Sequence, residues 1–264
     1  DTQYAVIDNF LVFKFWAGEQ LAYMMPVGSG DLKAVLRELI EDADKEKHNF
    51  CMLGVCSNMR ADLEAILPGQ FTFTENRDYA DYIYLRSDLA TLKGKKFQAK
   101  RNHINRFRNT YPDYEYTPIT PDRIQECLDL EAEWCKVNNC DQQEGTGNER
   151  RALIYALHNF EALGLTGGIL HVNSKIVAFT FGMPINHETF GVHVEKADTN
   201  IEGAYAMINY EFANRIPEQY IYINREEDLG IEGLRKAKLS YQPVTILEKY
   251  MACLQDHPMN MVKW

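Results

Sequence analysis

The amino-acid sequence predicts a protein of the α+β class with mixed sheets, and three observations lead to this prediction. The second half of the chain reads as helix, three antiparallel strands, helix, strand, helix and strand. A short turn at Asn173-Ser174 joins the first two strands of the central meander, which argues against a doubly wound parallel sheet. The 264 residues are 45% hydrophobic, enough for two domains or one duplicated domain.

The first expected helix follows a short apolar stretch at residues 21–27. Its start is marked by the sequence Gly-Ser-Gly-Asp, where Ser29 or Asp31 can cap the helix. This segment lacks both the lysine of a P-loop and the spacing of a dinucleotide fingerprint, so we interpret it as a turn. Apolar side chains then recur at helical spacing and predict one buried face: Leu32, Val35, Leu36, Leu39 and Ile40.

Two buried strands are expected at residues 50–55 and 79–85, where apolar runs are bounded by Gly, Pro and Asn. A helix is expected at residues 92–111, which carry an approximate apolar stripe. Thr120 and Pro121 mark the start of another helix, because they combine a capping residue with a proline in the first turn.

The second half shows its elements more clearly. The expected helices are at residues 151–163, 203–216 and 232–239, and the first of them ends at Gly164. The expected strands are at residues 168–172, 175–183, 189–194, 220–223 and 244–250.

Composition limits the class of protein. The net charge of −10 argues against a general coat for nucleic acid. Six cysteines in a chain this rich in apolar residues indicate reduced thiols and a cytoplasmic location. The chain has no apolar run near 18 residues and no signal-peptide pattern at its start.

One phrase occurs twice. The sequence YIYLRSDL begins at Tyr82 and YIYINREEDL begins at Tyr220, each reading as a strand that leads toward a helix. The first copy precedes a run of lysines and the second a run of acids. This echo suggests a duplicated unit.

The longer segments at residues 93–107, 194–209 and 224–243 resemble the C-terminal catalytic domain of phosphatidylglycerol lysyltransferases, a domain also found in many bacterial proteins. The family is related to the Fem-type peptidoglycan aminoacyltransferases, and the resemblance covers nearly the whole chain. It implies two fused GNAT-like acyltransferase repeats, which we place at residues 1–115 and 116–264. Tyr82 and Tyr220 are then expected on equivalent strands of the two repeats.

The resemblance also implies an activity. A transferase of this kind moves an aminoacyl or acyl group from an activated donor to an amine or hydroxyl of a small molecule or lipid headgroup. The donor is an aminoacyl-tRNA or an acyl-coenzyme A, and direct attack needs no covalent intermediate, metal or tightly bound cofactor. The alternative is a non-catalytic module that binds RNA or another anionic ligand.

Basic charge is concentrated between Asp88 and Asp113, where seven lysines and arginines occur without an acid. A helix there suits the phosphates of a donor. Solvated lysines paired with acids elsewhere are the alternative interpretation. The candidate donor-binding residues are Lys96, Lys100, Arg101 and His103.

GNAT enzymes bind the pyrophosphate of coenzyme A with a glycine-rich loop at a helix start. The corresponding residues here are Asn200, Gly203 and Tyr205, with Asn209 one turn further on. Asn200 and Tyr205 depart from the family pattern, and Glu202 adds a negative charge. These departures favour aminoacyl-tRNA over coenzyme A, while a plain helix start capped by Gly203 remains the alternative.

Candidate catalytic residues lie at the ends of expected strands, where GNAT-like folds place their chemistry. A carboxylate can accept the proton of the attacking group, and cations can hold an anion or a polarised carbonyl. The same cations can instead pair with the acidic run. The catalytic candidates are Glu195, Asp198, Glu226, Asp228 and Tyr241, and the further binding candidates are Arg225, Arg235 and Lys238.

Overall fold

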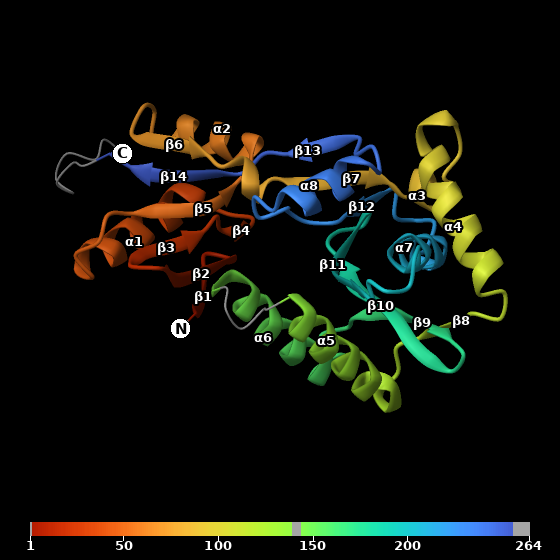
Figure 1. The fold of residues 1–264 in the computed structure, drawn as a ribbon. Helices are drawn as coiled ribbons and strands as arrows, with labels where there is room; N and C mark the ends of the chain where they lie inside the picture. The colour runs from red at the N-terminus through yellow and green to blue at the C-terminus, as the bar shows by residue number, and fades with distance from the viewer. Residues whose placement is uncertain (1, 139–143, 256–264) are drawn as a thin grey trace. The chain divides into compact units, whose positions relative to one another are not determined.

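The computed structural model describes residues 2–138 and 144–255. Contacts divide the chain into two compact units (Figure 1). Unit 1 comprises Asp1–Asp81, Glu227–Ile231 and Leu247–Trp264, and unit 2 comprises Tyr82–Glu226 and Glu232–Ile246. No helix among the described residues is both long and apolar enough to cross a membrane.

Unit 1 contains a seven-stranded sheet with the order β1-β2-β3-β5-β14-β6, and β4 pairs with β2. The pair β3/β5 is parallel, and the pairs β1/β2, β2/β3, β2/β4, β5/β14 and β6/β14 are antiparallel. The strands are β1 Gln3–Ile7, β2 Phe10–Ala17, β3 Gln20–Met24, β4 Val27–Gly28, β5 Cys51–Val55, β6 Phe71–Glu75 and β14 Tyr250–Leu254.

Two helices belong to unit 1, α1 (Leu32–Lys45) and α2 (Ser57–Ile66). The predicted face of α1 is buried against the sheet, as Val35 and Leu36 show. Of the two predicted caps, Asp31 is the one used: its side chain accepts a hydrogen bond from the Ala34 amide at 3.1 Å. The turn-and-cap interpretation of this segment is therefore confirmed.

Unit 2 is built on a second sheet with the order β13-β7-β12-β11-β10-β9-β8. Its strands are β7 Asp81–Leu85, β8 Glu115–Pro118, β9 Thr166–Val172, β10 Lys175–Pro184, β11 Thr189–Ala197, β12 Tyr222–Asn224 and β13 Thr245–Leu247. Its α-helices are α3 Arg86–Thr91, α4 Gln98–Thr110, α5 Ile124–Asn138, α6 Glu144–His158, α7 Ala204–Arg215 and α8 Glu232–Leu239.

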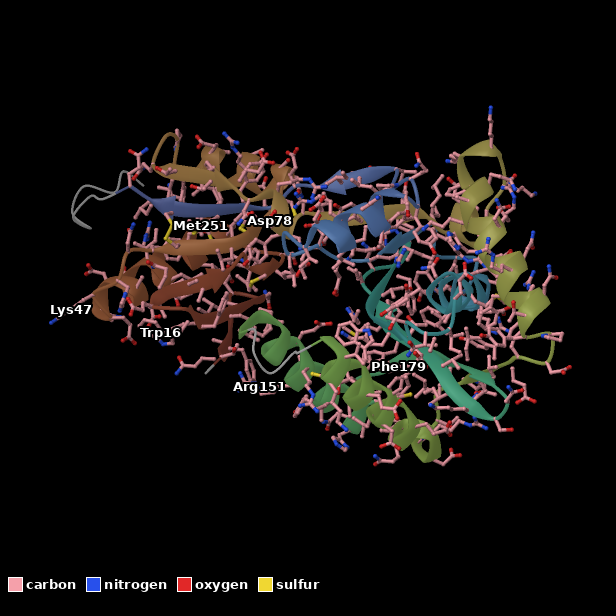
Figure 2. The ribbon with its side chains drawn as sticks, in the orientation of Figure 1. Trp16, Lys47, Asp78, Arg151, Phe179 and Met251 are labelled. Atoms are coloured by element: carbon pink, nitrogen blue, oxygen red, sulfur yellow. A yellow bond between two sulfur atoms is a disulfide. The ribbon has the colours of Figure 1, made fainter. Side chains whose placement is uncertain are left out.

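Helices cover both faces of this second sheet (Figure 1). Leu170 and Val192 pack with residues of α4 and α7 in one cluster. On the other face, Phe179 (labelled in Figure 2) packs with residues of α5 and α6, such as Leu130 and Leu157. The strands of the meander are therefore buried on both sides, which explains their nearly continuous apolar sequence.

The two sheets share one plan around their parallel strands. In the first, α1 connects β3 to β5 and α2 leads on to β6; in the second, α7 connects β11 to β12 and α8 leads on to β13. The next strand of each series enters the opposite sheet. Strand β7 lies between β12 and β13, and β14 lies between β5 and β6. The predicted fold class of two mixed sheets is confirmed.

This exchange corrects the interpretation of the repeated YIY phrase. The first copy forms β7 and the second forms β12, and these strands are antiparallel neighbours in one sheet, with Tyr84 opposite Ile223. The prediction that they occupy equivalent positions of two repeats is wrong, because the counterpart of β7 is β14. A repeat boundary between residues 115 and 116 stays a prediction; the compact units are divided differently and place α4 in unit 2.

The cysteines also differ from expectation. Cys51 of β5 and Cys253 of β14 form a disulfide, although we expected reduced thiols. The two residues face each other directly in the antiparallel register of these strands. Their separation of 202 positions in the sequence hid this proximity. Cys56, Cys127 and Cys135 are free thiols.

Candidate functional site

The candidate site lies in unit 2, where the parallel strands β11 and β12 separate. Their register runs only from Thr189 opposite Tyr222 to Gly191 opposite Asn224. Strand β12 then ends, whereas β11 continues to Ala197. The second half of β11 thus loses its neighbour on this side, and Arg225 and Glu226 follow β12 into the opening.

A β-bulge in β11 sets the direction of the side chains at this opening. Pairing with β10 passes from Gly182 opposite Val192 to Phe181 opposite Val194, which leaves His193 without a partner residue. Val192 packs in the cluster that contains α7, but Val194 packs in the cluster that contains α5 and α6. The bulge therefore breaks the alternation of the strand, as bulges beside active sites often do.

Glu195 joins α7 to the segment after β12. Its Oε1 accepts a hydrogen bond from Nη2 of Arg225 at 2.9 Å, and its Oε2 accepts one from Nδ2 of Asn209 at 3.1 Å. The side chains of Glu195 and Arg225 are only 14% and 11% exposed. Burial lowers the pKa of Arg225, but Glu195, through its charge and its hydrogen bond, together with Tyr84 and Tyr241 raises this pKa overall. Arg225 is therefore a cation.

His193 and Glu226 form a second pair beside the first. Nδ1 of His193 lies 2.6 Å from Oε1 of Glu226. Glu226 adopts a left-handed conformation, with φ of 57°, which is uncommon for a residue other than glycine. The Asn224 side chain accepts a hydrogen bond from the Glu226 amide, and Nζ of Lys238 donates to the carbonyls of Arg225 and Glu226. These bonds position the consecutive residues Arg225 and Glu226, whose side chains contact Glu195 and His193 of β11.

Unsatisfied hydrogen-bonding groups gather here. Among the described residues, three buried side-chain polar atoms lack a partner: Nε2 of His193, Oδ1 of Asn209 and Nη1 of Arg225. Each belongs to one of the two pairs or to Asn209, which donates a hydrogen bond to Glu195. Leaving such an atom unpaired costs about 1–3 kcal/mol, and strain of this kind is typical of sites that bind a substrate.

Lys100 of α4 adds a second cation to the site. Its Nζ lies 3.9 Å from the centre of the Tyr241 ring, and the guanidinium carbon of Arg225 lies 4.8 Å from the same centre. Burial, reinforced by the positive charge of Arg225, lowers the pKa of Lys100 to about 8, while Glu195 opposes this shift. Burial raises the pKa of Tyr241, so its phenol stays neutral.

The other predicted donor-binding residues of the basic segment lie elsewhere. Lys96 is paired with Asp88 at 2.8 Å, and Arg101 donates to the carbonyls of Leu92 and Gly94, where α3 ends. His103 is exposed on α4. The helix expected at residues 92–111 is not continuous, because Leu92 and Gly94 have positive φ and α4 starts only at Gln98.

The predicted pyrophosphate loop has local structural roles. Asp198 accepts hydrogen bonds from the amide and side chain of Asn200, and Tyr205 accepts one from the Trp134 indole. At Gly203, which has φ of 87°, an added Cβ would lie 2.9 Å from the His103 carbonyl oxygen. The glycine thus allows α7 to approach α4 closely.

Three further predicted site residues do not join the two pairs formed by Glu195 with Arg225 and by His193 with Glu226. The side chain of Asp228 is fully buried in unit 1, where it forms an ion pair with Arg77 at 3.5 Å. Arg235 is half-buried on α8. Lys238 is buried and donates hydrogen bonds to backbone carbonyls, so its role is to stabilise the backbone of Arg225 and Glu226.

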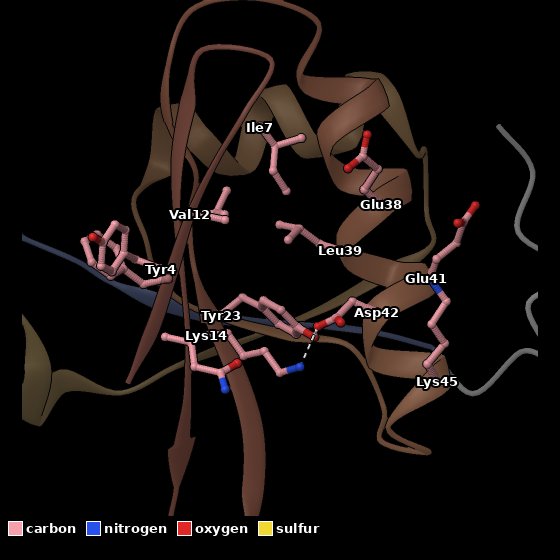
Figure 3. A pocket seen from close by; sticks show the side chains of 13 residues that line it. Tyr4, Ile7, Val12, Lys14, Tyr23, Glu38, Leu39, Glu41, Asp42 and Lys45 are labelled. Carbon is pink, nitrogen blue, oxygen red and sulfur yellow. Dashed lines mark hydrogen bonds and ion pairs between the residues drawn. The ribbon is translucent and has the colours of Figure 1, made fainter. Parts of the chain in front are cut away.

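Unit 1 has a separate cavity of about 490 Å³ between α1 and the strands β1 to β3 (Figure 3). Its polar lining includes Asp42, whose carboxylate accepts hydrogen bonds from Lys14 at 2.8 Å and Tyr23 at 2.7 Å. None of the predicted site residues lines it. Because its buried polar groups are paired with one another, it is the weaker candidate for chemistry.

His193 is the residue that the sequence analysis did not assign to the site. It lies two positions before Glu195, a spacing that would place both side chains on one face of a regular strand. Its pairing with Glu226 depends on the bulge and on the left-handed turn, and neither feature has a clear signal in a single sequence. Tyr84 was likewise not predicted; its ring lies 5.7 Å from the Arg225 guanidinium.

Comparisons with known proteins identify the family of this chain. The family profile described as phosphatidylglycerol lysyltransferase, C-terminal, matches residues 1–253. An uncharacterized protein of Mycoplasmoides gallisepticum is 25% identical over 177 residues, which are 65% of this chain and 55% of that protein. The match thus spans about half the length of that curated relative.

Solved structures show similar folds. A conserved protein of unknown function from Bacteroides thetaiotaomicron is 95% identical, with a TM-score of 0.93 over 96% of this chain and 86% of that one. L-PGS from Bacillus licheniformis is 18% identical, with a TM-score of 0.67 over 98% and 86% of the two chains. A tandem GNAT protein from the clavulanic acid biosynthesis pathway is 10% identical, with a TM-score of 0.51 over 94% and 80%.

The family profile spans nearly the whole described chain, and the solved structures share its two-sheet fold. This result also supports the expected assignment to the transferases. The chain therefore belongs to the phosphatidylglycerol lysyltransferase C-terminal family and has a tandem GNAT-like fold.

Proposed function

We propose that this chain transfers an aminoacyl group from an aminoacyl-tRNA to an amine or hydroxyl acceptor, by direct attack of the acceptor on the ester carbonyl. Family membership supports acyl transfer in general. The choice of an aminoacyl donor rests on the polarity of the groups at the opening between β11 and β12.

The observation that carries this proposal is the pair of unpartnered atoms on either side of Glu195. Oδ1 of Asn209 can only accept a hydrogen bond, whereas Nη1 of Arg225 can only donate one. An aminoacyl ester has an α-ammonium group, which donates, next to a carbonyl oxygen, which accepts. It matches both atoms at once, and the Glu195 carboxylate adds a favourable charge for the ammonium. A simple acetyl group has no donor for Asn209.

The cations of the site suit the chemical step. When a nucleophile attacks an ester, negative charge develops on the carbonyl oxygen, and preorganised donors in a buried site stabilise it. Arg225 offers Nη1 for this purpose, and Lys100 adds a positive charge over the shared Tyr241 ring. Arg225 needs little reorganisation during the reaction, because its hydrogen bond to Glu195 already holds it in place.

The acyl-coenzyme A alternative has less support. The space beside Gly203 is occupied by the backbone of α4, and Glu202 forms an ion pair with Arg106 at this helix start. A lipid headgroup or a small molecule with an amine or hydroxyl fits the family as the acceptor. Lys93, Lys95 and His103 are exposed near α4 and remain candidates for contacts with the phosphates of the tRNA.

A test compares aminoacyl-tRNA with the same tRNA after acetylation of its α-amino group. The purified protein is mixed with each donor and with amine, hydroxyl and lipid-headgroup acceptors, and loss of the ester is followed with a radiolabelled amino acid. Acetylation removes the ammonium charge, so we expect the free aminoacyl donor to react about 10- to 100-fold faster, in line with one charged hydrogen bond.

The variant Asn209→Leu should lose this preference, because it removes the acceptor for the ammonium while retaining similar volume. Arg225→Met should lower kcat/KM by about 10²-fold with either donor. Arg37→Met, at an exposed position of α1, is the matched control and should leave both values unchanged. Binding of tRNA without any loss of ester would instead support a non-catalytic module, and use of acyl-coenzyme A alone would support the alternative donor.

A further inference from the structure

The pair of His193 and Glu226 has no role in the proposed binding of the aminoacyl group. The imidazole of His193 lies beside the Glu195 and Arg225 pair on β11, at the residue where the strand bulges. Its side chain is 27% exposed, yet Nε2 is buried and has no hydrogen-bond partner. A buried ring nitrogen without a partner lowers the stability of the folded protein, which suggests that this nitrogen has a function.

The partner of the other ring nitrogen determines the protonation of the imidazole. A carboxylate is only an acceptor, so in the contact of 2.6 Å Nδ1 of His193 donates its hydrogen to Glu226. In the neutral imidazole Nε2 then carries the lone pair. The buried and unpartnered Nε2 is therefore a proton acceptor, and the Glu226 carboxylate on the other ring nitrogen can stabilise the imidazolium that forms after proton transfer.

The backbone around Glu226 supports this role. Its left-handed conformation costs free energy, and the surrounding bonds from Asn224, Lys238 and the Tyr82 amide maintain it. An extended residue would direct its side chain away from that of Arg225. The left-handed conformation allows Arg225 to contact Glu195 and Glu226 to contact His193 at the same time. The strained backbone therefore positions both pairs of the site.

We infer that His193 is the general base of the transfer reaction and that Glu226 is its positioning residue; this inference rests on the proposed function. As the acceptor nitrogen or oxygen attacks the ester carbonyl carbon, Nε2 removes its proton and the new bond forms. The tetrahedral intermediate then breaks its bond to the ribose oxygen of the donor. The protonated Nε2 returns the proton to that oxygen, so the enzyme ends in its initial state.

The first experiment measures transfer by His193→Ala and by His193→Gln, which keeps a polar side chain if alanine disturbs the fold. A general base contributes about 10²- to 10⁴-fold, so kcat should fall at least 100-fold with KM changed less than threefold. Added imidazole should restore part of the rate to His193→Ala. Glu226→Gln should lower kcat about tenfold or more. His187→Ala, at an exposed loop position of unit 2, is the control and should retain the wild-type rate.

The second experiment does not depend on activity. Nitrogen NMR of histidine-labelled protein should show His193 with a hydrogen on Nδ1 and a free Nε2, and Glu226→Gln should shift this balance. A kcat within threefold of the wild type in both His193 variants, or a hydrogen on Nε2 in the neutral wild-type protein, would overturn the inference. A wild-type protein that consumes no donor refutes the proposed function itself, and the NMR result then decides the protonation of His193 separately.

Discussion

Lys100 is held as a cation in surroundings that disfavour its charge. Burial and the nearby Arg225 lower its pKa to about 8, from 10.5 in the unfolded chain. Below pH 8 both states hold the proton and the folded state carries the full penalty. Between pH 8 and about 10.5 the folded state releases the proton first, so its relative stability increases with pH.

The variant Lys100→Met should therefore be more stable than the wild type at pH 7, by on the order of 1 kcal/mol after allowance for solvent screening. This advantage should shrink at pH 9, because the wild-type lysine is by then mostly neutral. Urea denaturation at the two pH values measures the difference. Lys236→Met, at an exposed position of α8, is the control and should show no such pH dependence. An equal advantage at both pH values would contradict the assignment of the charge penalty to Lys100.

The residues of the site show how far a single sequence can be interpreted. The resemblance placed Glu195, Asn209 and Arg225 among the candidates, and the structure brings them into one hydrogen-bonded group. It also named Asp228, which instead packs within unit 1. Glu226 and Asp228 both follow β12, two positions apart, yet Glu226 contacts His193 and Asp228 contacts Arg77. The left-handed turn at Glu226 lies between β12 and Asp228, and sequence periodicity does not encode such a turn.

At the scale of elements, the start of α7 depends on Gly203. This residue combines a positive φ with a close approach to α4, since an added Cβ would also lie 3.1 Å from Cβ of Phe107. Gly203→Ala should therefore destabilise the protein by about 1–3 kcal/mol, through backbone strain and displacement of α4. Chemical denaturation gives the free energy of unfolding.

Gly233 in α8 provides a matched control. An added Cβ there meets no atom within 4 Å, so Gly233→Ala should be neutral or stabilising by up to about 1 kcal/mol. Similar effects of the two substitutions would mean that the α4 contact does not limit position 203.

The elements themselves were predicted unevenly. Helix α8 was predicted within its observed bounds, and the meander within two or three residues of them, because its strands are long and apolar. The β1/β2 hairpin was not predicted, although Asp8 and Asn9 form the kind of positive-φ turn that joins such strands. The strand expected at residues 244–250 is divided between β13 and β14. Local pattern cannot reveal that division, because the two halves belong to different sheets.

At the scale of the whole molecule, the exchange of β7 and β14 predicts unequal behaviour of fragments. Residues 81–247 contain all seven strands of the second sheet, so this fragment should fold and unfold cooperatively. Residues 1–80 lack β14, a central strand of the first sheet, and should remain largely unfolded. Circular dichroism and amide NMR can measure both outcomes.

A peptide of residues 247–255 supplies β14 and should restore strand signal to the fragment of residues 1–80. A peptide with the same composition in scrambled order serves as the control. Spontaneous folding of residues 1–80 alone would show that β14 is dispensable and that the exchange has little energetic weight.

The exchange also has a consequence for the order of events during protein synthesis. The ribosome releases the N-terminal portion first, and domains generally fold in that order. Here the first sheet cannot be completed until Leu254 has been made, because β14 lies between β5 and β6, which are made much earlier. The second sheet is complete at Leu247. The last strand of the sheet that carries the candidate chemistry is therefore made before the last strand of the sheet whose synthesis began first.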